Sequence, residues 1–373
     1  ILLIFSSYLC DFKKHKQYAR LLYFILFILF YVVSALRYHI GGDTLMYISF
    51  HKYYPDFFDF TWAKDVNWFN TNVRANYQPG WILYAMLVRS LNPDFMFMQI
   101  VSAFIVNCGI FYAIRKYSPY PFTTLLIYFL TFTFIMFEFE VLREAVGVGF
   151  FLLIAFDGWM QKKWVRYYIG AFIAYMFHSS AILMFALPFI RYINWKNRTY
   201  LLFFILPALI LGFAGRIFLG DIISNLLDAQ SSMQFYNNRA IDSAYNTNYI
   251  FTTLYQPFML LAFMILWRKY VNPTLVPIVF ATITIQIFAL FDFDCARLAN
   301  YIMIPTYIAI TSILFKLAKR AKTIWVVVLF MLVYYVPNAY VVWSGGEKSW
   351  SRYIPYQTAI YPNQTEAQKR YWK

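Results

Sequence analysis

The chain has 373 residues, of which 61% are hydrophobic and only 13% are charged. A soluble domain is near half apolar and a quarter charged, so this composition excludes an ordinary water-soluble fold. The net charge of +15 would suggest a nucleic-acid partner for a soluble protein. In a membrane protein it follows from the gathering of Lys and Arg on the cytoplasmic side, so we expect no nucleic acid.

Apolar runs of about 20 residues recur along the chain and predict an all-α polytopic membrane protein with roughly 10–12 transmembrane helices. We see no internal repeat or linker and expect one transmembrane domain over 1–373. No signal peptide is visible, and we expect the first helix to begin before Ile1. The predicted segments are 1–10, 21–37, 94–114, 120–139, 142–161, 199–219, 250–267, 275–291, 296–315 and 323–343.

Two apolar stretches do not read as simple spans. Pro79–Leu91 is too short to cross about 30 Å of hydrocarbon, and "HSS" interrupts Val165–Arg191. If both are broken or re-entrant, more than half of the basic residues fall in short loops on one side, which the positive-inside rule makes cytoplasmic. All acidic residues except Asp11 and Asp157 then lie on the outer side.

Three longer segments belong to this predicted outer face, at 38–78, 220–249 and 344–373. The first contains "DTLMYISFHKYYPDFF" and "TWAKDVNWFNTNV", aromatic amphipathic pieces of the kind that lie in the membrane interface. The second is polar, and the third is rich in Tyr and Pro. Polar segments over a membrane domain suit a hydrophilic substrate at the outer interface.

Ionisable groups also gather at the predicted outer ends of helices, where they face partners or aqueous cavities. Several arginines at one interface suit a phosphate or diphosphate, which guanidinium groups bind in bidentate fashion. We therefore expect the diphosphate ligands to be Arg37, Arg143, Arg239 and Arg297. Carboxylates and histidine suit general-base activation of a hydroxyl, and the candidates are Asp43, His178, Glu140 and Glu144.

Aromatic faces suit the stacking of sugar rings, and we expect glycan contacts from Tyr47, Asp294 and Tyr301. The three cysteines have no disulfide or zinc spacing, and no metal-ligand cluster is visible, so we expect no metal and no cofactor. Together these groups describe a site for a lipid diphosphate sugar.

Each of these features also has a purely structural explanation. Arg37 can be an interfacial anchor, the pair Gly41–Gly42 a helix C-cap, and His178 a packing residue. Asp43 can cap the following helix. The charged groups Glu140–Arg143–Glu144 and Asp294–Arg297 can be structural ion pairs.

The chain resembles the EpsG/Wzy group of bacterial exopolysaccharide and O-antigen polymerases. The similar pieces, in order, are "LRYHIGGDTLMY", "YQPGWILYAMLVRSL", "LREAVGVGFFLLIA", "YIGAFIAYMFHSSAILMFALPF", "CARLANYIMIPTYIAI" and "YIPYQTAIY". Two positions depart from the pattern. Gln78 stands where the family has an acid, and Glu144 stands where it more often has Gln.

The resemblance implies a GT-C-like glycosyltransferase in the bacterial inner membrane, with its active site facing the periplasm or exterior. Its donor would be a growing glycan on undecaprenyl diphosphate, and its acceptor a hydroxyl of another lipid-linked repeat unit. A chain-length regulator is an expected partner. A flippase or transporter, an O-antigen ligase and a membrane acyltransferase are the alternatives. The scarcity of charge at mid-helix positions disfavours transport.

Overall fold

The computed structural model describes residues 1–61, 67–68, 71, 77–192, 200–210, 247–288, 297–333 and 351–371. Within this part of the chain every named element is a helix, which confirms the predicted all-α class. The chain divides into two compact units. The first unit comprises Ile1–Phe185 and Met331–Lys373, and the second comprises Ala186–Phe330.

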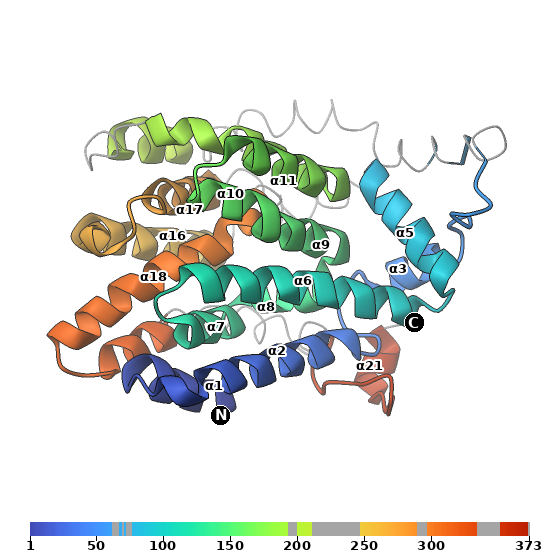
Figure 1. Cartoon of the computed structure of the whole chain (residues 1–373), viewed down its shortest axis with the longest axis horizontal. Coiled ribbons are helices and arrows are strands. Elements are labelled where there is room, and N and C mark those ends of the chain that lie inside the picture. Colours follow the sequence, from blue (N-terminus) through green and yellow to red (C-terminus); the bar gives the residue numbers. More distant parts are fainter. Residues whose placement is uncertain are drawn as a thin grey trace. The chain divides into compact units, whose positions relative to one another are not determined.

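The first unit is built around four helices packed in series (Figure 1). α2 (Ala19–Ala35) packs against α6 (Phe95–Tyr117), and α6 packs against α9 (Leu142–Phe150). α9 in turn packs against α11 (Trp164–Phe177). The shorter helices and helical turns are α1 (Leu2–Ser6), Ser7–Phe12, Lys16–Tyr18, α3 (Thr44–His51), α5 (Pro79–Leu91), α7 (Pro121–Leu130), α8 (Phe132–Ile135), Met136–Glu140, Phe151–Phe156, α10 (Asp157–Met160), Ser179–Phe185 and α21 (Glu366–Tyr371).

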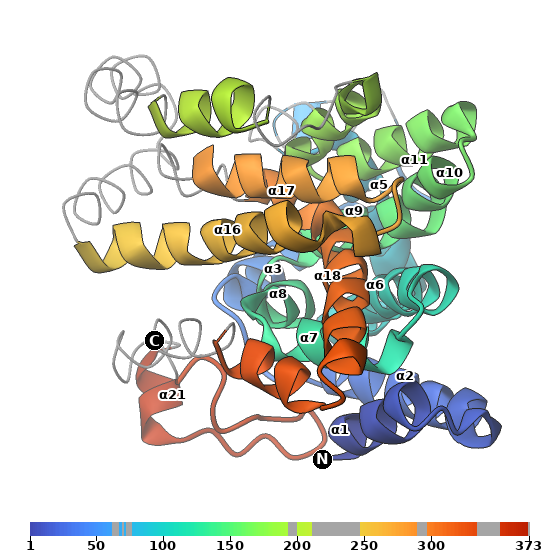
Figure 2. The same cartoon turned by 90° about the vertical axis from the view of Figure 1, so that its left-hand side faces the viewer.

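The second unit contains three longer helices, and Figure 2 shows them from the side. α17 (Val276–Phe288) packs against both α16 (Thr247–Trp267) and α18 (Asn300–Arg320). Its short helical turns are Leu187–Tyr192, Leu201–Ile205 and Arg268–Tyr270.

Three stretches of the described residues are long and apolar enough to cross a membrane, namely Lys16–Ala35, Phe95–Tyr117 and Arg297–Arg320. The bent pair Pro121–Leu130 and Phe132–Glu140 passes the same test when its two halves are taken together. These helices support the membrane assignment. The predicted span 250–267 lies within α16, a helix of 21 residues. The remaining predicted spans fall on shorter or interrupted helices, or partly outside the described residues.

The predicted membrane segment 120–139 contains a bend that the sequence did not indicate, because the chain turns by 79° between α7 and α8. Thr131 is extended at the bend, and its hydroxyl donates to the carbonyl of Tyr128 over 2.8 Å. The Thr131 N–H is shared between the carbonyls of Ile127 and Tyr128. These bonds satisfy carbonyls at the end of α7, so the chain can turn without leaving them unpaired.

The predicted break at "HSS" is confirmed. α11 ends at Phe177, His178 is extended, and a 3-10 helix over Ser179–Phe185 follows. Helices α6 and α9 also approach closely at Gly149. A Cβ built on Gly149 would lie 2.8 Å from the carbonyl oxygen of Ile105 in α6, closer than packed atoms allow. Because Gly149 has no side chain, α6 and α9 can pack closely at this point.

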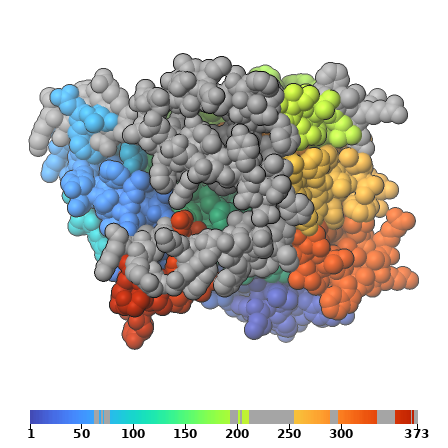
Figure 3. All heavy atoms as spheres, turned by 180° about the vertical axis from the view of Figure 1, so that it is seen from behind, coloured from blue at the N-terminus to red at the C-terminus, as the bar shows by residue number. Residues whose placement is uncertain are grey.

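The C-terminal segment 351–371 is tied to the end of α2. Tyr38 N–H donates to the carbonyl of Gln357 over 3.0 Å, and Ala359 N–H donates to the carbonyl of Leu36 over 2.8 Å. Arg37 and Thr358 form an isolated antiparallel bridge between these two bonds. The segment carrying α21 and the segment carrying α3 lie at the same end of the first unit in Figures 1 and 3.

Candidate functional site

Arg37 follows the last turn of α2 and is 4% exposed. One terminal nitrogen donates to the carbonyl of Ser34 over 2.6 Å, and the Arg37 carbonyl accepts from the Gln99 side chain over 2.8 Å. Its buried Nε has no hydrogen-bond partner among the described residues. Burial lowers the pKa of the guanidinium to about 10, and the charge of Glu138 opposes this shift. Arg37 is thus a buried cation at neutral pH with donor capacity left over.

Glu138 supplies the counter-charge to Arg37, and the sequence analysis missed it as a site residue. It is 1% exposed and accepts from the Tyr128 hydroxyl over 2.8 Å, the Asn107 amide over 3.0 Å and the Ser34 hydroxyl. Within the described part of the chain it makes no direct ion pair with Arg37. Polar residues such as Ser34 and Asn107 inside apolar runs were the available signal, since buried polar groups need partners.

Glu140 is held by the glycine turn that follows Arg37. Gly42 N–H donates to its carboxylate over 2.6 Å, and the Tyr353 hydroxyl donates to its other oxygen. Gly41 has φ +100°, and a Cβ there would lie 1.8 Å from the carbonyl oxygen of Phe139. The turn therefore needs glycine both for its backbone conformation and for its contact with the Glu140 segment.

Arg143 lies in the first turn of α9 and faces two tyrosines. Its guanidinium carbon is 4.5 Å from the centroid of the Tyr77 ring, and the side chain is hydrogen-bonded to Tyr47. Tyr47 also interacts electrostatically with Arg37. Arg143, in α9, therefore bonds this buried phenol, and Arg37, in the segment after α2, lies within electrostatic range of it. We name these three residues the arginine cluster.

Asp43 lies near the arginine cluster, because its negative charge raises the pKa of both Tyr47 and Tyr77. Burial raises the pKa of Tyr47; Arg143 opposes this shift, and Asp43 adds to it. Asp43 is the N-cap residue of α3, but its side chain makes no capping hydrogen bond. Helix capping therefore does not explain the position of the Asp43 carboxylate.

Glu144 and His178 are linked through Ser180, a residue for which the sequence predicts no role. The Ser180 hydroxyl donates to the buried Glu144 carboxylate over 2.9 Å and lies 2.7 Å from Nδ1 of His178. The backbone N–H of Ser180 also donates to Nδ1 of His178, over 3.3 Å. Ser180 therefore fixes the orientation of the imidazole ring and joins it to the Glu144 carboxylate.

Aromatic side chains lie beside the arginine cluster. The Trp81 indole donates to the Tyr54 hydroxyl over 3.1 Å, and its ring is 5.9 Å from that of Tyr47. Trp81 is on α5, and Gly80 next to it sets the contact with α11, because a Cβ there would lie 2.7 Å from the Met176 carbonyl oxygen. Tyr47 and Trp81 are both buried.

The first unit contains seven of the predicted residues, near the ends of α2, α9 and α11: Arg37, Asp43, Tyr47, Glu140, Arg143, Glu144 and His178. Arg297 and Tyr301 belong to the second unit, where Tyr301 is fully buried in α18. Arg239 and Asp294 lie outside the described residues. No group of three or more His, Cys, Asp and Glu side chains suited to a metal occurs in the described ranges.

A family model described as the EpsG family matches residues 20–358. The chain belongs to the EpsG family. The match covers nearly the whole chain and includes Arg37, Asp43, Arg143 and His178. Membership indicates a membrane protein of polysaccharide biosynthesis, a polymerase of the glycosyltransferase type. Searches of curated proteins and of solved structures returned no match.

Proposed function

We propose that this EpsG-family protein transfers a growing glycan from undecaprenyl diphosphate to a hydroxyl of another lipid-linked repeat unit, at the outer face of the bacterial plasma membrane. The observation that carries the proposal is a pair of cations at this site: the buried Arg37, whose Nε has no partner among the described residues, and Arg143, which stacks 4.5 Å from the Tyr77 ring. Negative charge develops on the diphosphate as it leaves, and fixed cations at that position lower the barrier. The uncapped start of α9 adds the positive end of a helix dipole beside Arg143.

In the proposed reaction, the bond between the sugar C1 and the diphosphate oxygen breaks. A new bond forms between C1 and the acceptor oxygen. The acceptor proton passes to a base, and undecaprenyl diphosphate leaves with the bonding electron pair.

We assign the role of base to Asp43, because its carboxylate and Arg143 both influence the pKa of Tyr47 and of Tyr77 and so lie near the same two side chains. That position would bring the proton acceptor to the same place as the diphosphate ligands. His178, oriented through Ser180 and Glu144, is the second candidate. Asp43→Asn and His178→Gln distinguish the two candidates, since only substitution of the true base should lower the polymerisation rate by more than about a hundredfold.

The test is mass spectrometry of the products made by purified protein from lipid-linked repeat units. We expect a ladder of glycans differing by one repeat unit, each on the lipid carrier, with undecaprenyl diphosphate released. Movement of intact lipid-linked glycan across reconstituted vesicles without lengthening would instead identify a transporter. Transfer to a different lipid acceptor would identify a ligase, and acyl transfer an acyltransferase.

A further inference from the structure

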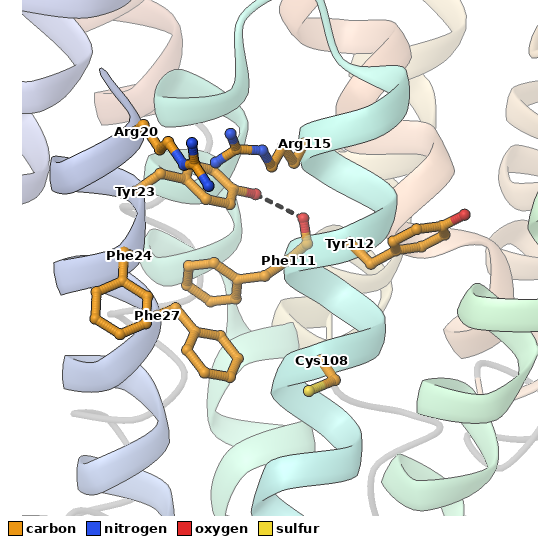
Figure 4. A pocket seen from close by; sticks show the side chains of 8 residues that line it. All are labelled: Arg20, Tyr23, Phe24, Phe27, Cys108, Phe111, Tyr112 and Arg115. Atoms are coloured by element: carbon orange, nitrogen blue, oxygen red, sulfur yellow. Dashed lines mark hydrogen bonds between the residues drawn. The ribbon is translucent and has the colours of Figure 1, made fainter. Parts of the chain in front are cut away.

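We propose that the groove between α2 and α6, at the end of these helices away from the arginine cluster, binds an anionic glycerophospholipid. Its lining residues are Arg20, Tyr23, Phe24, Phe27, Cys108, Phe111, Tyr112 and Arg115 (Figure 4). The groove has a volume of about 420 Å³, within the range of sites that bind small molecules.

Two guanidinium groups lie at one end of this groove. α2 and α6 run in opposite directions, so Arg20 near the start of α2 and Arg115 near the end of α6 lie close together, as Figure 4 shows. Arg20 makes no hydrogen bond or ion pair with the other described residues. The contact of Arg115 is with the Tyr23 ring, whose centroid is 5.2 Å from its guanidinium carbon. Both arginines are exposed and can turn toward a shared anion.

The acidic groups that approach this region, Asp11 and Asp157, are already engaged, Asp157 with Lys116 and Arg166. The charge of Asp11 reaches Tyr23, but its carboxylate accepts from the backbone N–H of Thr123 over 2.7 Å and from its hydroxyl over 2.9 Å. The Tyr23 hydroxyl donates to the carbonyl of Phe111 over 2.7 Å. Arg20 and Arg115 are therefore left facing a space whose other walls are apolar or internally bonded.

The rest of the groove is apolar and runs along the helices. Cys108 is seven residues from Arg115 and Phe27 is seven residues from Arg20, which is about 10 Å along a helix axis. Phe24 is 59% exposed, so the groove is open at its side. A cationic end followed by about two turns of apolar surface matches a phosphate headgroup with the first part of an acyl chain. Arginines bind the phosphate in bidentate fashion, and basic pockets between membrane helices hold anionic headgroups.

The test is native mass spectrometry of the purified full chain in detergent, titrated with phosphatidylglycerol and with phosphatidylcholine. We expect phosphatidylglycerol to remain bound at higher collision energy and to be preferred over phosphatidylcholine. Each basic residue near an anionic headgroup contributes about fivefold in affinity, so Arg20→Gln with Arg115→Gln should weaken phosphatidylglycerol binding about 25-fold. The control, Lys162→Gln with Lys163→Gln, removes two basic charges outside the groove and should bind as the wild type does.

A second measurement locates the acyl chain. Phosphatidylglycerol with a diazirine in the upper part of its chain should label peptides that contain Phe24, Phe27 or Cys108, and the double arginine variant should reduce this labelling. Equal binding by the wild type and the double variant, equal loss in the lysine control, or labelling elsewhere would overturn the proposal. Full displacement of the lipid by inorganic diphosphate would also overturn it, since it would show an anion site without a lipid chain.

Discussion

Two buried charged residues in the first unit differ in how fully their hydrogen-bonding groups are paired. Asp157 is fully buried and accepts from Tyr117 over 2.5 Å, Tyr112 over 2.8 Å and Gln161 over 2.7 Å. It also forms ion pairs with Lys116 and with Arg166, the latter over 2.6 Å. Arg37, which is also buried, makes no direct ion pair within the described residues, and its Nε has no partner among them. A buried charge whose hydrogen-bonding groups are paired stabilises the packing of helices. A buried cation with unpaired donors suits an anionic ligand.

The largest effect should come from Arg143→Ala. If Arg143 stabilises the leaving diphosphate, its removal should lower the polymerisation rate by at least about a hundredfold, or about 3 kcal/mol in the activation barrier. Loss of the Tyr77 contact should lower the free energy of unfolding by only about 1 kcal/mol. The rate per folded protein and the thermal unfolding midpoint measure the two separately. Arg143→Lys is the matched control and should keep part of the rate; an unchanged rate in Arg143→Ala would exclude the role.

Asp157→Asn should have the opposite effect, lowering the stability of the protein but not its polymerisation rate. It leaves several donors facing an amide, so we expect a loss of about 2 kcal/mol in the free energy of unfolding. The figure is moderate because the side chains of Lys116 and Arg166 are 39% and 41% exposed and can turn to water. The rate per folded molecule should stay at the wild-type value. A large fall in that rate without a change in stability would contradict the structural role.

Glu138→Gln tests whether the counter-charge of Arg37 matters for function. Gln keeps the size of the side chain but places an amide among three donors, which should cost about 1–2 kcal/mol of stability. With the opposing charge gone, Arg37 is a less well compensated cation, and we expect a rate change of about tenfold. Glu138→Ala, compared by the same thermal and product assays, should be less stable than Glu138→Gln. Equal stability would show that the hydrogen bonds contribute little.

The smallest effect should come from Tyr353→Phe. This change removes one hydroxyl that donates to Glu140, and the typical net contribution of such a bond is about 1 kcal/mol. We expect a fewfold rise in the substrate concentration for half-maximal rate, because Glu140 holds the glycine turn between Arg37 and Asp43. Tyr361→Phe, on an exposed side chain of the same segment, is the control. An identical response of both variants would argue against the tie to Glu140.

The positions of the helices and several site residues follow from the sequence, but the pairing of polar groups does not. The apolar runs predict α2 and α6, and "HSS" predicts the end of α11 at Phe177. The bend at Thr131 was missed because "LTFTF" reads as part of one apolar run. It depends on partners distant in sequence, since Glu138 beyond the bend bonds Ser34 and Asn107.

The candidate site shows the same limit. Charge at helix ends indicated Arg37, Asp43 and Arg143, and in the structure all three lie within electrostatic range of Tyr47. Ser180 could not be found in this way, because a neutral serine carries no charge signal and its role depends on Glu144 from another helix. The roles of Arg239, Arg297 and Asp294 stay predictions.

The most direct test of the central claim is the dissociation constant for undecaprenyl diphosphate itself, measured on purified protein. We predict that Arg37→Gln with Arg143→Gln weakens binding about a hundredfold while the protein stays folded, and that Asp157→Asn binds as the wild type does. If the double variant and the wild type bound the lipid diphosphate equally well, the arginine cluster would not be the diphosphate site.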